Sequence, residues 1–272
     1  MTPPVSILIL KLGDTLPELR ARHGDFEHWM AQGLRRSGLD LQLEVADPRP
    51  HAAPPTATDT SPAPHGNLPR RHGLPTGAEL AARGAGVLIT GSHAMVTDRE
   101  PWSETTATWL ADVVARGLPV LGVCYGHQLL AHALGGEVWP HPDGLELGTV
   151  QVETTEHAPS DPLLGDLPRR FQAQVAHRQS VRRLPAGATV LARNGFEPHH
   201  AYRVGECAWG VQFHPEFGPQ ASQGYLQHLA DDLQRQGQDP QALTAQVTPS
   251  PEAANLLARF AHQVAQRATP RP

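Results

Sequence analysis

The sequence is poor in cysteine, in long apolar runs and in positive charge. Its 272 residues include two Cys, too few for a disulfide framework, so we expect a reducing compartment, the cytoplasm. The longest apolar run, Val5 to Leu10, is too short to span a membrane and lacks the basic flank and cleavage site of a signal peptide. With 22 Lys+Arg against 27 Asp+Glu, the net charge is −5. We therefore expect neither a membrane nor a nucleic acid as partner.

Proline and glycine are abundant instead, with 27 and 25 residues, and eight of the prolines fall between Pro48 and Pro75. This stretch has almost no aliphatic side chains, so it cannot bury enough apolar surface to offset the entropy lost on ordering. We expect a mobile surface loop over residues 48–75, with a polyproline docking site as the alternative. The chain length suits one domain over residues 1–272 with a sizeable core, ending in a C-terminal extension at 236–272 that holds one helix.

Strand-like and helix-like segments alternate over the first half of the chain. Val5–Leu10 is a continuous apolar run, as in a strand covered on both faces. Further segments follow: strands at 41–46, 86–90 and 119–123, helices at 26–34, 103–116 and 125–134, then short β runs at 149–153, 171–176, 189–192 and 208–213, and helices at 221–234 and from Ser250. The pattern predicts an α/β fold with an open, mostly parallel central sheet, helices on both faces and a smaller antiparallel β portion.

Cys124 is the candidate nucleophile, because Gly122-Val123-Cys124-Tyr125-Gly126 lies where a predicted strand meets a predicted helix. This is the pattern of a nucleophile elbow, with Cys at its centre. The tight turn strains the backbone of the nucleophile, and a glycine two residues to either side removes the clashes. The helix N-terminus supplies free N–H groups and a positive dipole end, which favour a thiolate and stabilise an oxyanion. The alternative is that Cys124, like many a lone Cys after a strand, serves only as a small buried apolar residue.

His214 is the candidate base, and Glu216 is its partner. Pro215 keeps His214 out of the helical conformation, so this segment stays extended. Residues i and i+2 of an extended segment point the same way, so Glu216 can bind one imidazole nitrogen while the other faces the nucleophile. A single His among 16 is more often a surface residue. The neighbouring proline and carboxylate, together with the elbow upstream, favour a triad of nucleophile, base and orienting carboxylate.

The two motifs together resemble those of the class I glutamine amidotransferases. Gly122 to Gln128 has the pattern G-x-C-x-G-x-Q, and His214-Pro215-Glu216 follows 90 residues after Cys124. Over residues 5–235 the chain is similar to free-standing proteins that resemble the amidotransferase domain of GMP synthase. The resemblance implies a flavodoxin-like sheet, glutamine or a γ-glutamyl compound as substrate, no cofactor and no metal. It also suggests a separate ammonia-accepting synthase subunit as partner.

The resemblance implies a role for each residue of the triad and of the loops beside it. Cys124 would attack the side-chain amide of glutamine and form a γ-glutamyl thioester, which releases ammonia. His214 would act first as base and then as acid, and Glu216 would orient it. Backbone N–H groups of Tyr125 and of the Gly91-Ser92 loop would form the oxyanion hole.

The substrate-binding residues are also implied by the resemblance. Gln128 would bind the substrate glutamine. The alternative is that Gln128 is simply a polar residue in the second turn of a helix, with no contact to the substrate. Residues 176–181 resemble the stretch S-H-G-D-x-V, so that Gln179, Ser180 and Val181 would hold the α-amino and α-carboxylate groups. Here Gln179 stands in place of Asp, and Arg178 stands in place of Gly. The lost carboxylate weakens the grip on an α-ammonium group, although Gln179 still accepts a hydrogen bond.

The remaining candidates are weaker. His93 stands where many relatives have proline, which leaves the backbone role of its loop intact and the role of its side chain open. Cys207 is expected to be a buried structural thiol, and His199-His200 a loop rather than a metal site. The 272 residues of the chain contain no phosphate-binding loop G-x-x-x-x-G-K-[ST] and no S-G-G-x-D-S loop, so we expect no ATP-using synthase half within them.

Three functions stay open. The first is a glutamine amidotransferase subunit that hydrolyses glutamine and passes ammonia to an acceptor. The second is a γ-glutamyl peptidase or hydrolase with the same triad, which the change at Arg178 and Gln179 keeps open. The third is a non-catalytic subunit on the same fold, which the complete set of Cys124, His214 and Glu216 disfavours.

Overall fold

The computed structural model describes residues 3–50, 68–71 and 73–268. Its strands are β1 (Val5–Leu10), β2 (Leu41–Ala46), β3 (Arg70–Arg71), β4 (Gly86–Ile89), β5 (Val120–Val123), β6 (Glu137–Pro140), β7 (Glu146–Thr154), β8 (Arg170–His177), β9 (Gln179–Arg183), β10 (Thr189–Arg193), β11 (Ala201–Val204) and β12 (Ala208–Val211). Its helices are α1 (Pro17–His23), α2 (Phe26–Arg35), α3 (Gly77–Ala82), α4 (Pro101–Ala115), α5 (Tyr125–Ala133), α6 (Pro219–His228), α7 (Ala230–Arg235), α8 (Pro240–Ala245) and α9 (Pro251–Ala268), with 3₁₀ turns η1 (Val96–Asp98) and η2 (Ala158–Ser160).

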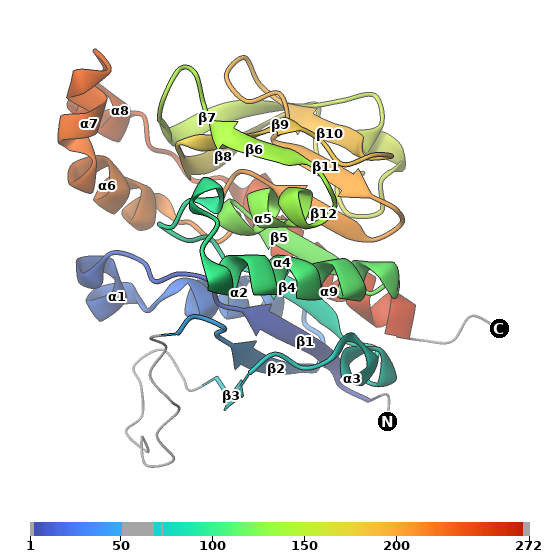
Figure 1. Cartoon of the computed structure of the whole chain (residues 1–272). Helices are drawn as coiled ribbons and strands as arrows, with labels where there is room; N and C mark the ends of the chain where they lie inside the picture. The colour runs from blue at the N-terminus through green and yellow to red at the C-terminus, as the bar shows by residue number, and fades with distance from the viewer. Residues whose placement is uncertain (1–2, 51–67, 72, 269–272) are drawn as a thin grey trace.

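One sheet runs through the molecule, and in the described ranges it has ten strands in the order β3-β2-β1-β4-β5-β12-β11-β10-β7-β8 (Figure 1). The strands from β3 to β12 pair in parallel. From β12 to β8 the pairing is antiparallel. A separate antiparallel pair joins β6 to β9. The predicted α/β fold, with a mostly parallel centre and a smaller antiparallel portion, is confirmed.

Helices cover both faces of the parallel half, as the run of four large apolar residues from Ile7 to Leu10 in β1 requires. Ile7 and Ile9 point to one face, where they join a buried cluster with residues of α2 and α9. Leu8 and Leu10 point to the other face, where they pack with residues of α4 and α5. Alternate residues of a strand point to opposite faces, so a continuous apolar run needs a layer on each side.

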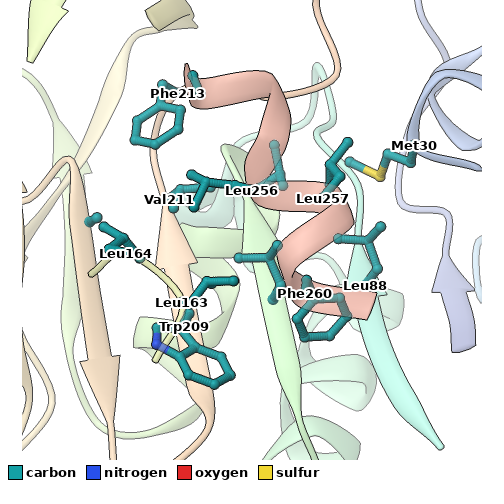
Figure 2. Close-up of a cluster of buried hydrophobic side chains, with 14 of the residues drawn as sticks. Met30, Leu88, Leu163, Leu164, Trp209, Val211, Phe213, Leu256, Leu257 and Phe260 are labelled. Atoms are coloured by element: carbon teal, nitrogen blue, oxygen red, sulfur yellow. The ribbon is translucent and has the colours of Figure 1, made fainter. Parts of the chain in front are cut away.

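The last helix, α9, is part of the core. Its predicted apolar residues Leu256, Leu257, Phe260 and Val264 are all fully buried. Figure 2 shows three of them beside Met30 of α2, Leu88 of β4 and residues of β12. This helix therefore contributes to the hydrophobic core that supports the parallel strands.

The structure differs from the sequence predictions in several places. The segment 236–272 holds two helices, α8 and α9, so the prediction of one helix was wrong. The short helix α8 is capped by Asp239, whose side chain accepts a hydrogen bond from the N–H of Gln241, and none of the helix residues is buried. The predicted helix 221–234 is divided into α6 and α7. Most of the predicted loop 48–75 lies outside the described residues, and the part that is described includes β3, which pairs with β2.

Candidate active site

Three neighbouring parallel strands end at the predicted catalytic residues. Strand β5 lies between β4 and β12, and all three run in the same direction. Cys124 follows β5 directly, Gly91 comes two residues after β4, and His214 comes three residues after β12. Carboxyl ends of parallel strands meet at one edge of a sheet. The sheet therefore brings together residues from three distant parts of the chain.

Cys124 occupies a strained turn between β5 and α5. Its backbone has φ 50° and ψ −103°, a conformation that residues other than glycine rarely adopt. A Cβ atom on Gly122 would lie 2.4 Å from the carbonyl oxygen of Gly126, and one on Gly126 would lie 2.8 Å from Cγ2 of Ile89. Only glycine fits at both positions. The turn thus has the geometry of the elbow that the sequence predicts.

His214 lies between Glu216 and Cys124. Its Nδ1 is 2.8 Å from Oε1 of Glu216, and the ring interacts with Cys124 through hydrogen bonding and charge. Burial disfavours the charged imidazolium, but Glu216 and Cys124 outweigh it and raise the pKa of His214 to about 10. Phe217 stacks on the ring with centroids 4.0 Å apart, which restrains its plane. The structure therefore brings together the three residues of the predicted triad.

The predicted oxyanion loop lies beside the triad. A Cβ atom on Gly91 would be 3.1 Å from Cε1 of His214 and 3.8 Å from Cβ of Cys124. The hydroxyl of Thr90 donates to the carbonyl oxygen of Gly91 at 2.9 Å and fixes the loop. On the other side, Tyr125 begins α5, so its N–H belongs to the first turn, where N–H groups have no partner within the helix.

A pocket of about 260 Å³ opens at Cys124. Of the predicted site residues, Ser92, Tyr125, Gln128 and Gln179 line it together with Cys124. Small-molecule pockets start at roughly 300 Å³. The pocket therefore suits a ligand the size of an amino acid or slightly larger.

Gln128 and Gln179 are linked to each other at the pocket wall. The amide nitrogen of Gln128 donates to the carbonyl oxygen of Gln179 at 2.9 Å and to Oε1 of Gln212 at 2.9 Å. These bonds use its two N–H donors, so Gln128 can offer a ligand only its oxygen. Gln179 donates to the hydroxyl of Thr97, whereas its buried Oε1 has no hydrogen-bond partner among the described residues. An unpaired buried acceptor is costly, so it is a natural place for a substrate N–H.

Ser180 and Val181 do not belong to the pocket lining. Both are fully buried, and Val181 pairs with Val138 of β6 in the small sheet. The structure thus brings Gln179 to the pocket and directs the next two residues into the interior.

The sequence motifs assigned no individual role to two further sets of pocket residues. His177 lines the pocket and is held by Glu146, whose Oε2 lies 2.8 Å from Nε2 of His177. Tyr225 and His228 of α6 also line the pocket, and Tyr225 reaches the oxyanion loop through its hydroxyl, which lies 2.9 Å from Nε2 of His93. The sequence predicts α6 as a helix, but it carries no signal that the helix packs against the site.

Other candidates lie away from this chemistry. Cys207 is buried, and its thiol donates to the carbonyl oxygen of Gly117 at 3.2 Å. Both cysteines are free thiols.

Within the described ranges, no group of three or more His, Cys, Asp or Glu side chains could hold a metal ion. None of the helices described has the length and apolarity needed to cross a bilayer.

Comparison with solved structures supports the fold. A glutamine amidotransferase from Thermotoga maritima matches with a TM-score of 0.68 and 19% identity, covering 97% of this chain and 100% of that chain. A glutamine amidotransferase from Methylobacillus flagellatus matches with a TM-score of 0.62 and 20% identity, covering 99% of this chain and 96% of that chain.

Comparison with curated sequences identifies relatives over about half of the chain. The GMP synthase (glutamine-hydrolysing) of Aeropyrum pernix is 41% identical over 138 residues, which are 51% of this chain and 25% of that protein. A γ-glutamyl-L-1-hydroxyisopropylamide hydrolase from a Pseudomonas species is 34% identical over 158 residues, 56% of this chain and 54% of that protein. The family model for glutamine amidotransferase class-I matches residues 74–231, more than half of the chain. With the elbow and the Cys-His-Glu cluster inside that range, the chain belongs to the class I glutamine amidotransferase family.

Proposed function

We propose that this enzyme hydrolyses the side-chain amide of glutamine to glutamate and ammonia through a γ-glutamyl thioester on Cys124. The observation that carries the proposal is the strained Cys124 elbow beside the His214–Glu216 pair. A nucleophile, a base within reach and a carboxylate that orients the base are the parts that acyl transfer requires.

The reaction would proceed in two halves. The sulfur of Cys124 attacks the amide carbon, the C–N bond breaks, and protonated His214 gives its proton to the departing nitrogen, which leaves as ammonia. A water then attacks the thioester carbonyl while His214 takes its proton, so that glutamate leaves and the sulfur is restored. The N–H groups of Tyr125 and of the Gly91-Ser92 loop would stabilise the negative oxygen in both halves.

The amino acid end of the substrate would lie against Gln128 and Gln179. The unpaired Oε1 of Gln179 supports a contact with the α-ammonium group, in place of the carboxylate that the family pattern has there. Ser180 and Val181 would act only through the position they give to Gln179. This proposal differs from the sequence prediction, in which all four residues bind the substrate.

The ammonia acceptor is expected to be separate from the matched region. The chain spans about a quarter of the GMP synthase it matches, and its 272 residues contain no motif of an ATP-using synthase. We propose a separate synthase subunit as the partner. Two free thiols, one of them the nucleophile, fit a reducing compartment such as the cytoplasm.

A γ-glutamyl hydrolase is the second candidate, because the same triad would cleave the side-chain amide of any γ-glutamyl compound that fits the pocket. The Pseudomonas relative bears the name of such an enzyme. A single assay tests the proposal: purified protein is incubated with glutamine, and released glutamate and ammonia are measured. Turnover that disappears in Cys124→Ala supports the proposal. No turnover by the folded wild-type protein, or equal turnover by the variant, would contradict it.

A further inference from the structure

The oxyanion loop of Gly91 and Ser92, with His93 directly after it, is held in place by side chains. These three residues take part in no backbone-to-backbone hydrogen bond with any described residue. The last such bond of the segment runs from the N–H of Thr90 to the carbonyl oxygen of Leu10. The free N–H groups suit an oxyanion hole, but the sheet does not fix them. Their position must therefore come from side-chain contacts.

The segment that follows β1 packs against the first end of the loop. The hydroxyl of Thr90 accepts a hydrogen bond from the N–H of Leu12 at 2.9 Å and donates one to the carbonyl oxygen of Gly91. A Cβ atom on Gly13 would lie 2.6 Å from Cα of Ser92. This end of the oxyanion loop thus lies directly on the backbone after β1.

Tyr225 of α6 holds the second end of the loop. Its hydroxyl is 2.9 Å from Nε2 of His93, and the two rings meet edge to face with centroids 5.6 Å apart. The same hydroxyl is 3.2 Å from Oγ1 of Thr15, in the segment after β1. A phenol O–H donates one hydrogen bond and accepts another, so Tyr225 can hold both partners at once. Tyr225 and Thr15 are both buried, so loss of either bond would leave a buried polar group with fewer partners.

The ring of Tyr225 also supports the base. Phe217 stacks on His214 with centroids 4.0 Å apart, and Tyr225 stacks on Phe217 with centroids 5.2 Å apart. A column of three rings therefore leads from the base to Tyr225, whose hydroxyl reaches His93. Tyr225 is thus in contact with the supports of both the base and the oxyanion loop.

Helix α6 is a firm support because it is tied to the base through β8. The hydroxyl of Ser222 in α6 donates to Oε1 of Gln174 at 2.6 Å. The backbone carbonyl oxygen of Gln174 accepts a hydrogen bond from the N–H of His214 at 2.8 Å. Figure 1 shows α6 beside β7 and β8, in agreement with its contacts to both strands. One buried residue of β8 therefore fixes α6 and His214 relative to each other.

We propose that Tyr225 is a positioning residue, which aligns the oxyanion loop with Cys124 and His214 through the bond of its hydroxyl to His93. This inference rests on the proposed hydrolysis of glutamine and extends it to α6. Negative charge develops on the substrate oxygen only when the sulfur bonds to the amide carbon. A displaced loop therefore weakens binding of the transition state rather than of the substrate. The effect of Tyr225 should fall on kcat and leave KM nearly unchanged.

Two single variants and their combination test this role in the full chain. Tyr225→Phe removes the hydroxyl and keeps the stacked ring. We expect kcat for glutamine to fall about tenfold, less than the roughly 100-fold or more that follows loss of an oxyanion donor itself. His93 is exposed on its loop, and His93→Ala should give the same loss. Because both act through one bond, the double variant should also lose about tenfold, rather than the roughly 100-fold of independent effects.

Alkylation of Cys124 by iodoacetamide separates this role from general damage to the site. In that reaction the sulfur displaces iodide from a saturated carbon, so no oxyanion forms. Mass spectrometry of the peptide containing Cys124 measures the rate, which should be the same in Tyr225→Phe as in the wild type. Tyr202→Phe is the matched control, because the hydroxyl of Tyr202 is also buried and donates to the carbonyl oxygen of His127, outside the pocket lining. Its kcat should stay that of the wild type.

Three results would overturn the inference and leave the proposed function standing. They are an unchanged kcat in folded Tyr225→Phe or His93→Ala, alkylation that slows as much as turnover, and losses that multiply in the double variant. A folded wild-type protein that does not hydrolyse glutamine would contradict the proposed function itself, and the inference with it. Melting temperatures verify that each variant is folded. Should Tyr225→Phe not fold, kcat and alkylation in His93→Ala decide the matter.

Discussion

Nδ1 of His214 lies 2.8 Å from a carboxylate oxygen of Glu216, two residues further along the chain. A bond at this nitrogen leaves Nε2 as the nitrogen that faces Cys124, so Glu216 determines the orientation of the ring. The short extended segment after β12 therefore supplies both the base and the group that orients it.

Removing the base should cost more activity than weakening its partner. We expect His214→Ala to lower kcat by about 1,000-fold, since proton transfer to the departing nitrogen is lost. Glu216→Gln keeps a hydrogen-bonding group beside His214, so we expect a loss of roughly 10- to 100-fold. Steady-state kinetics with glutamine checks the order, and a larger loss in Glu216→Gln would contradict the triad.

The pH dependence of turnover should reflect the raised pKa of His214. The ring is protonated in the free enzyme up to a pH of about 10, and its proton is needed by the leaving ammonia. Activity should therefore be sustained through pH 8–9 and decline as the pH rises through about 10. In Glu216→Gln the alkaline decline should move to lower pH, because the carboxylate that stabilises the charged ring is gone. A decline near pH 7 in the wild type would contradict this assignment.

The sequence allowed the elbow and the parallel strands to be predicted, because both are encoded locally, whereas the pairing of Cys124 with His214, 90 residues away, was inferred from two separate motifs. The elbow needs two glycines at fixed spacing, and β1 needs a continuous apolar run, so Gly122, Gly126 and Val5–Leu10 carry these signals directly. The pocket walls were not predictable in the same way. Tyr225 reaches His93 only because α6 packs beside β7, a contact between residues 132 positions apart. Asp232 likewise meets Arg178 across 54 positions.

Replacing the first glycine of the elbow should destabilise the fold. In Gly122→Ala the new Cβ would lie 2.4 Å from the carbonyl oxygen of Gly126, which is backbone and cannot move away easily. We expect a loss of about 2–3 kcal/mol in the free energy of unfolding, measured with denaturant. Gly195→Ala is the matched control, since a Cβ there has no neighbour within 4 Å. Similar losses in both variants would contradict the account of the elbow.

His200 should make the protein sensitive to acid. Burial lowers its pKa to about 4, although nearby Glu146 favours the charged ring. The unfolded chain binds this proton near pH 6.5 and the folded chain only near pH 4, so stability is present above 6.5 and is lost as the pH falls toward 4. The free energy of unfolding is measured at pH 6.5 and at pH 4. We expect the difference between the two values to be smaller by about 3 kcal/mol in His200→Leu than in the wild type. The same slope in variant and wild type would contradict the prediction.

The thioester on Cys124 is the central claim, and mass spectrometry of acid-quenched enzyme during glutamine turnover tests it most directly. The account predicts that the peptide containing Cys124 gains the mass of one γ-glutamyl group, that the peptide containing Cys207 does not, and that Cys124→Ala gains none. Glutamine hydrolysis by an enzyme that carries the group on Cys207, or that never carries it on Cys124 under conditions where acylation is faster than hydrolysis, would contradict the account.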